Sequence, residues 1–295
     1  MNGGDQVLAL RLRTHVERLA GDIGERNVFV PPALRRAAAY IENEWGALGY
    51  AVDRLEYQVS GIHCANLVTT LKGSARQSEI LLLGAHYDSV FGSPGANDNA
   101  SGVAALLEIS RMFQALEPAL TVRFVAFVNE EPPFFWTRQQ GSTVYARAAR
   151  HRGDDIRLMA SLETIGCYSS EPGSQSYPPL FRFFYPNRGN FIAFVSDFRS
   201  RTAMGRLAAA FRAQSDFPLQ TVSTFRFIPG VAWSDHLSFW RQGYPAVMVT
   251  DTAFYRYRHY HSAADTPEKL AYPELAQVTL GLFKAFALLA NEGVG

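Results

Sequence analysis

The hydrophobic pattern of the first 71 residues predicts two helices followed by two strands. Apolar residues recur at helical spacing over 7–19 and again over 33–48. Pro31 and Pro32 precede the second stretch and Gly49 follows it, as expected for the start and end of a helix. Two extended apolar runs, 51–59 and 64–71, are separated by Ser60-Gly61, which is typical of neighbouring strands.

From residue 79 onward, extended apolar runs alternate with helical patterns. The run 79–85 is continuously apolar, as in a strand buried on both faces. Further strands are expected at 121–128, 157–162, 191–195, 219–227 and 245–250, and helices at 100–116, 142–150, 201–214, 234–242 and 273–291. This alternation predicts an α/β fold with three layers, in which helices flank both faces of a mixed, mostly parallel sheet. Neither a linker nor an internal repeat divides the chain, so one domain is expected over residues 1–295.

Composition narrows the class of protein. The 295 residues are 47% apolar and 19% charged, with a formal net charge of +1, which argues against disorder. A net charge so close to zero does not favour binding to nucleic acid or to an anionic membrane, so neither is an expected partner. We see no apolar run of membrane-spanning length and no signal peptide, which favours the cytoplasm unless a leader was removed. Cys64 and Cys167 lack a CxxC spacing and are expected to be reduced thiols.

Metal-ligand residue types follow four of the predicted strands. In a largely parallel sheet, sites form at the carboxyl ends of strands. Carboxylates that converge there repel one another unless cations are present, and two divalent cations would balance them. The residues concerned are His86, Asp88 and Asp98 after the first buried strand, Glu130 and Glu131 after the next, Glu163 after the third, and Tyr260 and His261 beyond the last.

Each of these residues also has a structural interpretation. Asp98 could cap the helix that follows it, Glu130 and Glu131 could lie in a solvated loop, and His261 could stack in its aromatic loop. Their joint position at strand ends favours a metal centre. His15, His63 and His151 have no carboxylate neighbours and are expected to be surface or structural residues. GxSxG, GxxxxGK[ST] and HExxH motifs do not occur, which argues against serine hydrolases, P-loop enzymes and helix-borne zinc proteases.

The motifs as a set resemble a known enzyme family. The segments are Ala85-His86-Tyr87-Asp88-Ser89, Gly95-Ala96-Asn97-Asp98-Asn99-Ala100-Ser101-Gly102, Asn129-Glu130-Glu131, Tyr260-His261 and Asp265-Thr266-Pro267. In content and order they resemble the zinc aminopeptidases of metallopeptidase family twenty-eight, which also includes glutamate carboxypeptidases and glutaminyl cyclases. The resemblance implies a zinc exopeptidase-like fold and two Zn²⁺ ions per chain.

The resemblance also implies a role for each residue. Asp98 would bridge the two ions, His86 and Glu163 would complete one ion, and Glu131 and His261 the other. Of the remaining three residues, Glu130 would be the general base and acid, Asp88 would orient His86, and Tyr260 would polarise the substrate carbonyl. The charges agree: two Zn²⁺ ions and three ligating carboxylates leave one positive charge, which suits a bound hydroxide.

Several features leave room for other interpretations. The family usually has Asp at the position of Glu163, which puts the first metal site in question. Ser234, Asp235 and His236 are read first as a helix cap with a structural Asp–His pair, and second as support for the site. The aromatic stretches 168–184 and 254–260 suggest a pocket for apolar or aromatic side chains, and the insertion 132–136 is expected to shape it.

The predicted function is hydrolysis of N-terminal peptide bonds in a peptide or aminoacyl substrate. One alternative is a glutaminyl cyclase, an acyltransferase with one zinc. A second is a carboxypeptidase for acidic dipeptides, in which Arg256 or Arg258 would bind the substrate carboxylate. A third is a scaffold protein that has lost catalysis, but a candidate ligand stands at every position. No sequence feature indicates an oligomeric state.

Overall fold

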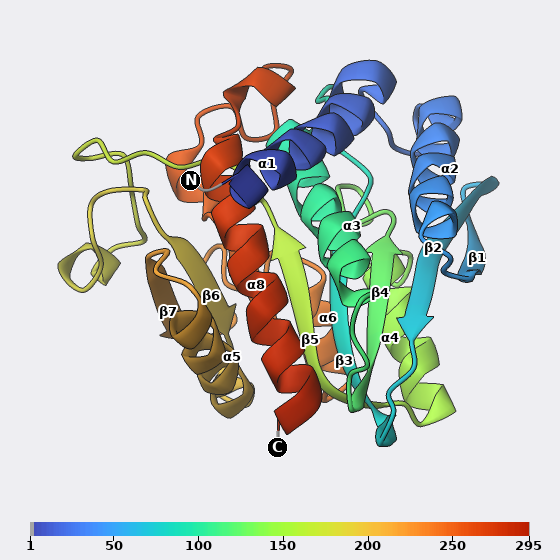
Figure 1. The fold of residues 1–295 in the computed structure, drawn as a ribbon. Helices are drawn as coiled ribbons and strands as arrows, with labels where there is room; N and C mark the ends of the chain where they lie inside the picture. The colour runs from blue at the N-terminus through green and yellow to red at the C-terminus, as the bar shows by residue number, and fades with distance from the viewer. Residues whose placement is uncertain (1–2, 295) are drawn as a thin grey trace.

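An eight-stranded sheet runs through the middle of the molecule (Figure 1). The structure, a computed structural model, describes residues 3–294. The strands lie in the order β1-β2-β4-β3-β5-β8-β6-β7. Their bounds are β1 Val52–Val59, β2 Ile62–Leu71, β3 Arg76–His86, β4 Leu120–Phe127, β5 Asp155–Glu163, β6 Ile192–Ser196, β7 Leu219–Ser223 and β8 Ala246–Thr250.

The centre of the sheet is parallel, and antiparallel pairings join it to the strands on either side. β4, β3, β5 and β8 pair in parallel, which brings their carboxyl ends to one edge. On one side, β2 pairs antiparallel with both β1 and β4. On the other side, β6 pairs antiparallel with β8. The sheet is therefore mixed and mostly parallel, as predicted, and the α/β fold class is confirmed.

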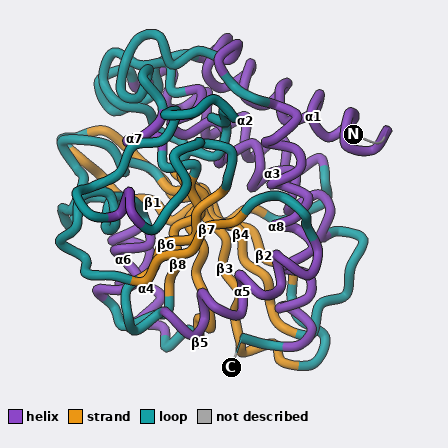
Figure 2. Tube along the Cα trace, turned by 90° about the vertical axis from the view of Figure 1, so that its left-hand side faces the viewer, coloured by secondary structure: helices purple, strands orange, loops and turns teal. Residues whose placement is uncertain are grey.

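Helices cover both faces of this sheet. Figure 2 shows α3 and α8 on one side of the strands and α4 and α6 on the other. The α-helices are α1 Gly3–Val16, α2 Pro31–Ala47, α3 Gly102–Phe113, α4 Gly141–Arg152, α5 Arg201–Gln214, α6 His236–Arg241, α7 Ala253–Arg256 and α8 Tyr272–Glu292. Two π-helical segments, η1 Glu17–Ile23 and η2 Ala96–Ser101, and two 3₁₀ turns, η3 Phe181–Phe183 and η4 Pro267–Lys269, complete the described elements.

The apolar core lies on both faces of the central strands. Along β3, Leu81, Leu83 and Ala85 pack into one cluster, whereas Ile80 and Leu82 pack into the other. Alternate side chains of a strand point to opposite faces, so a strand covered on both sides is apolar throughout. This accounts for the continuous apolar run that the sequence shows there.

Helix α8 is long and apolar enough to cross a membrane by length and composition alone. In this structure, however, 56% of its most apolar window is buried inside the protein. It packs on α1, α3 and α5 and reaches β4. A buried core helix passes the same test of length and composition, and the packing of α8 is of that kind.

Among the predicted elements whose bounds differ in the structure are one strand and one short helix. The strand expected to reach residue 227 stops at Ser223, opposite Ser196, where its neighbour β6 also stops. The alternating Phe225 and Phe227 therefore have no strand to pair with and lie exposed. The helix expected from residue 234 begins at His236, because Ser234 takes part in the site described next.

Candidate metal centre

Five ligand-type side chains reach one edge of the sheet from separate parts of the chain. His86 is the last residue of β3 and Glu163 the last residue of β5. Asp98 lies in η2, just before α3. Glu131 follows β4 in a loop, and His261 comes from the loop beyond α7. The convergence follows from the parallel centre of the sheet, which places these strand ends side by side.

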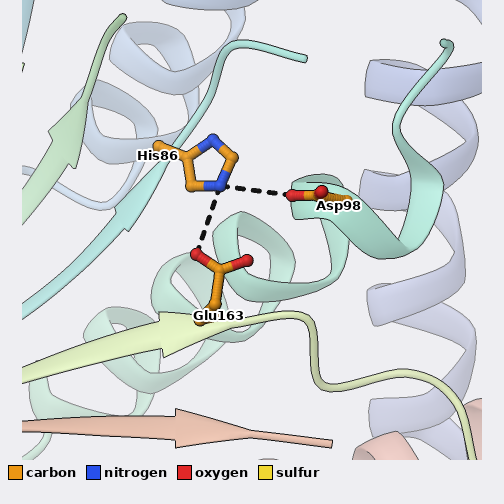
Figure 3. Close-up of side chains that lie close together, drawn as sticks. All are labelled: His86, Asp98 and Glu163. Carbon is orange, nitrogen blue, oxygen red and sulfur yellow. Dashed lines mark ion pairs between the residues drawn. The ribbon is translucent and has the colours of Figure 1, made fainter. Parts of the chain in front are cut away.

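The first group consists of His86, Asp98 and Glu163 (Figure 3). The Nε2 atom of His86 lies 3.3 Å from Oδ1 of Asp98 and 3.3 Å from Oε2 of Glu163. Ligand atoms placed 2.0–2.2 Å from a tetrahedral ion are separated by roughly 3.3–3.6 Å. These separations therefore suit three ligands of one such ion.

The second group consists of Asp98, Glu131 and His261. Here Nε2 of His261 lies 3.0 Å from Oδ2 of Asp98 and 3.4 Å from Oε2 of Glu131. Asp98 thus offers Oδ1 to the first group and Oδ2 to the second. A carboxylate with one oxygen in each of two ligand groups is placed to bridge two ions.

Unpartnered buried atoms support a metal at this edge. Within residues 3–294, the buried Nε2 of His86 and Oε1 of Glu131 have no hydrogen-bond partner. Buried polar atoms without partners are uncommon, and each usually has a specific reason. The donor set consists of two imidazoles and three carboxylates. The separations between their ligand nitrogens and oxygens are those expected around a tetrahedral ion, so the set fits a divalent cation such as Zn²⁺.

Asp88 connects the first metal group to the loop that carries Glu130 and Glu131. Its Oδ1 accepts the backbone N–H of Glu130 and its Oδ2 accepts that of Glu131, each at 3.2 Å. Oδ1 also lies 3.6 Å from Nδ1 of His86, and the Asp88 carbonyl oxygen lies 3.2 Å from the same nitrogen. A group that holds the second ring nitrogen of a metal-binding histidine fixes the orientation of its ring.

The loop that carries Asp98 is held by a second carboxylate. Asp265 accepts the backbone N–H groups of Asn97 at 2.8 Å and Asp98 at 3.1 Å, and the Tyr257 hydroxyl donates to it at 2.8 Å. Asp98 makes no capping hydrogen bond to α3, whose N-cap residue is Ser101. The helix-cap interpretation of Asp98 is therefore wrong.

Glu163 points into the site and not into solvent. It is 7% exposed, and the hydroxyl of Ser234 donates a hydrogen bond to its Oε2 at 2.7 Å. Ser234 does not cap the following helix, and Asp235 and His236 do not pair. Instead, Nε2 of His236 contacts the Val231 carbonyl at 2.8 Å. The first interpretation of this segment is wrong, because Ser234 supports a ligand-type residue.

Crowded carboxylates determine the electrostatics of the site. Burial raises the pKa of Glu130 well above its usual value, and Glu163, Asp235 and Asp88 raise it further. Burial also raises the pKa of Glu131, and the neighbouring carboxylates of Asp98 and Glu130 raise it further. Such an arrangement favours binding of cations or retention of protons. Glu130 itself lies 4.0 Å from Nε2 of His86, which is longer than the ligand spacings.

Asp98 and His86 respond in opposite directions to the same contacts. Burial alone would raise the pKa of Asp98, but the neighbouring imidazoles of His261 and His86 outweigh this effect and the pKa is lowered. Burial would likewise lower the pKa of His86, but Glu163, Asp88 and Asp98 raise it well above its usual value. The Asp98 carboxylate therefore stays ionised, and an ionised carboxylate is the form that binds a metal ion.

An apolar pocket of about 110 Å³ opens beside Glu163 and Tyr260. Its walls include Tyr177 and Phe181 from the first aromatic stretch and Phe254, Tyr255 and Tyr260 from the second, together with Val222, Ile228, Val231, Trp233 and Met248. Both stretches that the sequence singled out therefore line one cavity. The insertion 132–136 supports the wall from outside, because the Trp136 indole donates to the Ala232 carbonyl at 3.1 Å.

Tyr260 lies between this pocket and the ligand groups. Its ring stacks on that of His261, with centroids 3.9 Å apart and planes 17° from parallel. Burial raises the pKa of Tyr260 well above its usual value, and Asp98, Glu131 and Glu163 add to the effect. The hydroxyl therefore keeps its proton and can act as a hydrogen-bond donor.

Arg256 is not available as a carboxylate clamp. It is half-buried, and its Nε donates to Oε1 of Gln175 at 2.7 Å. Its Nη1 donates to the carbonyls of Cys167, Gly189 and Phe191. These bonds hold loops together behind the pocket, so Arg258, which is exposed, is left as the candidate for that role.

Sequence comparisons agree with the geometry. A profile described as Peptidase family M28 matches residues 66–285. The chain is 40% identical over 258 residues to "Uncharacterized protein YfbL" of Escherichia coli, covering 84% of this chain and 78% of that one. It is 26% identical over 286 residues to a "Probable zinc metalloprotease" of Pyricularia oryzae, covering 83% of this chain and 55% of that one.

Solved structures of the same fold include a zinc aminopeptidase and a glutaminyl cyclase. BSAP, a zinc aminopeptidase from Bacillus subtilis, has a TM-score of 0.77 at 14% identity, with 96% of this chain and 95% of that chain covered. Fimbriiglobus ruber glutaminyl cyclase has a TM-score of 0.69 at 19% identity, with 95% of each chain covered. These similarities show the fold. The family profile covers more than half of this chain and includes both ligand groups, and the protein therefore belongs to Peptidase family M28.

Proposed function

We propose that the protein is a zinc-dependent aminopeptidase that holds two ions per chain. The observation that carries this proposal is the placement of Asp98, with one carboxylate oxygen in each of two complete ligand groups. His86 and Glu163 would complete one site, and Glu131 and His261 the other. When bound, zinc would lower the pKa of water and polarise the scissile carbonyl.

The chain's own residues would supply the remaining steps. Glu130 is buried beside the ligand residues, but its carboxylate lies farther from His86 than the ligand atoms lie from one another. It is therefore free to take a proton from the attacking water. It can then deliver that proton to the leaving amine. The protonated Tyr260 hydroxyl is placed to donate a hydrogen bond to the carbonyl oxygen as negative charge develops there.

The pocket beside Glu163 and Tyr260 would accept the side chain of the first residue. Its volume of about 110 Å³ is comparable with the ~150 Å³ apolar cavity known to hold a benzene ring. We therefore propose that a large apolar or aromatic N-terminal residue is preferred. Each methylene buried in such a pocket is worth roughly 1–3 kcal/mol of discrimination.

A glutaminyl cyclase is the second candidate, and one observation favours it. The fold of a known cyclase covers nearly the whole chain, and Asp98, Glu130, Glu131 and His261 are the positions at which the resemblance leaves both activities possible. The first ligand group argues for the peptidase, because a one-zinc enzyme has no need for His86 and Glu163 at tetrahedral spacing.

Metal content and substrate polarity together test the proposal. The zinc-loaded protein should contain two ions per chain and hydrolyse leucyl- and phenylalanyl-anilides, and N-acetylation of the same anilides should abolish turnover. One ion per chain, with ring closure of a glutaminyl peptide and release of ammonia, would establish the cyclase instead. Turnover of N-acetylated dipeptides with a free acidic carboxyl terminus would favour the carboxypeptidase.

A variant that fills the pocket tests the substrate preference. Val222 lines the cavity on β7, away from the ligand groups. Val222→Phe should lower kcat/KM for the phenylalanyl-anilide at least tenfold, while the alanyl-anilide should change little. Equal losses for both substrates would show that the cavity does not receive the side chain.

A further inference from the structure

A buried arginine ties together the chain segments that carry the metal-ligand residues. Arg26 is 0% exposed. Its Nε donates to the Tyr87 carbonyl at 2.7 Å and its Nη2 to the Gly95 carbonyl at 2.9 Å. Its Nη1 donates to the carbonyls of Gly24 at 3.2 Å, Leu19 at 3.5 Å and Pro94. The guanidinium thus contacts backbone oxygens from three separate segments.

Two of these segments lead directly to the site. Tyr87 stands between His86 and Asp88, and Gly95 stands three residues before Asp98. The main chain adds further ties, because the N–H of Arg26 donates to Oγ of Ser89 and the N–H of Ser89 donates to the Arg26 carbonyl, both at 3.1 Å. Gly95 has φ +62, and a Cβ there would collide with the Asp98 carbonyl. The same Cβ would collide with Cβ of Ser89, so the turn before Asp98 packs closely on the segment that Arg26 holds.

The charge of Arg26 also suits this location. Burial lowers its pKa to about 10, whereas Asp88, Asp265, Asp98 and Glu131 favour the charged form. An ionised group buried away from water is costly unless it is fully hydrogen-bonded or balanced by charge. Here all three guanidinium nitrogens donate to carbonyl oxygens, and the carboxylates of the site supply the balancing charge.

We propose that Arg26 is a positioning residue for the metal centre: it sets the spacing between His86 and Asp98 by fixing the backbone on either side of them. This inference rests on the proposed function only in taking zinc as the ion. It assigns a role to the N-terminal segment, which lies outside the residues 66–285 that match the family profile. Arg26 touches neither ligand, so it acts through the segments it holds.

Zinc affinity, measured by competition with a chelator, separates this role from general stabilisation. Arg26→Met removes the charge and all five donated bonds, and it should weaken zinc binding 10–100-fold, as loss of supporting contacts around metal ligands typically does. Arg26→Lys keeps the positive charge, but a single ammonium group with three N–H donors cannot reach all the carbonyl oxygens that the guanidinium contacts. This variant should therefore also weaken zinc binding, by several-fold. Arg26→Lys is the variant to measure if Arg26→Met does not fold.

Arg123→Met is the matched control. Arg123 is another mostly buried arginine, on β4, and it donates to the Tyr145 hydroxyl at 3.0 Å and to Asp154 at 2.6 Å, outside the ligand groups. The control should lower the melting temperature but leave zinc affinity and the visible spectrum of bound Co²⁺ unchanged, whereas the Arg26 variants should alter both. Wild-type zinc affinity in a folded Arg26→Lys or Arg26→Met protein would overturn the inference. If the wild type itself failed to bind zinc, the proposed function would fail instead.

Discussion

Replacing Asp88 with asparagine would test how the site is assembled. Asp88 is 2% exposed, and its two carboxylate oxygens each accept one backbone N–H from Glu130 and Glu131. Asparagine has almost the same shape but only one oxygen. Whichever way its amide is turned, one buried N–H will face another donor.

The cost can be worked out from these contacts. Hydrogen bonds to a charged acceptor contribute about 1.5–3 kcal/mol each, and an unsatisfied buried donor costs about 1–3 kcal/mol. Because one bond is lost and the other weakened, Asp88→Asn should lower the free energy of unfolding by about 2–4 kcal/mol. Displacement of the loop and loss of the contact with His86 should also weaken zinc binding roughly 10–100-fold.

Urea unfolding and chelator competition would measure the two effects separately. Asp154→Asn is a suitable control, since Asp154 accepts hydrogen bonds from Arg123 on β4 and Arg152 on α4 and does not contact a ligand residue. It should cost stability without changing zinc affinity. A folded Asp88→Asn protein with unchanged unfolding free energy and zinc affinity would refute the reasoning.

The strand pattern was sufficient to predict the sheet and the candidate ligands. A buried parallel strand is a continuous apolar run, and the polar residue that follows it must lie at the edge of the sheet. His86 and Glu163 are the last residues of their strands, so short-range pattern places them. The alternation of Phe225 and Phe227 misled the same reasoning, because a strand also needs a partner and β6 ends at Ser196.

The supporting contacts could not be predicted in this way. Ser234 reaches Glu163 across 71 positions in the chain, and Arg26 reaches Gly95 across 69. Neither residue belongs to a motif or a periodic run, and a serine before a short helix looks like a cap. Such contacts are identified only when the fold brings distant backbone segments together. From the sequence, Ser234 therefore had a supporting role only as a second interpretation, and Arg26 had none.

Three further predictions concern the chemistry and the stability of the fold. Glu130→Gln should keep the fold and both ions but lose at least ~10²-fold in kcat, the size of a general-base contribution, and near-normal turnover would exclude the assigned role. Asp98→Ala should lose both ions and His261→Ala mainly one; elemental analysis that found two zinc ions retained in Asp98→Ala would contradict bridging. The last concerns His236, whose pKa burial lowers to about 4. The unfolded chain protonates this histidine near pH 6.5, whereas the folded protein resists until about pH 4, so stability is present above pH 6.5 and is lost as the pH falls. The difference is worth roughly 3 kcal/mol between pH 7 and 4. Denaturant unfolding of His236→Gln should therefore show a shallower loss over this range than the wild type, and parallel profiles would mean that His236 titrates alike in both states.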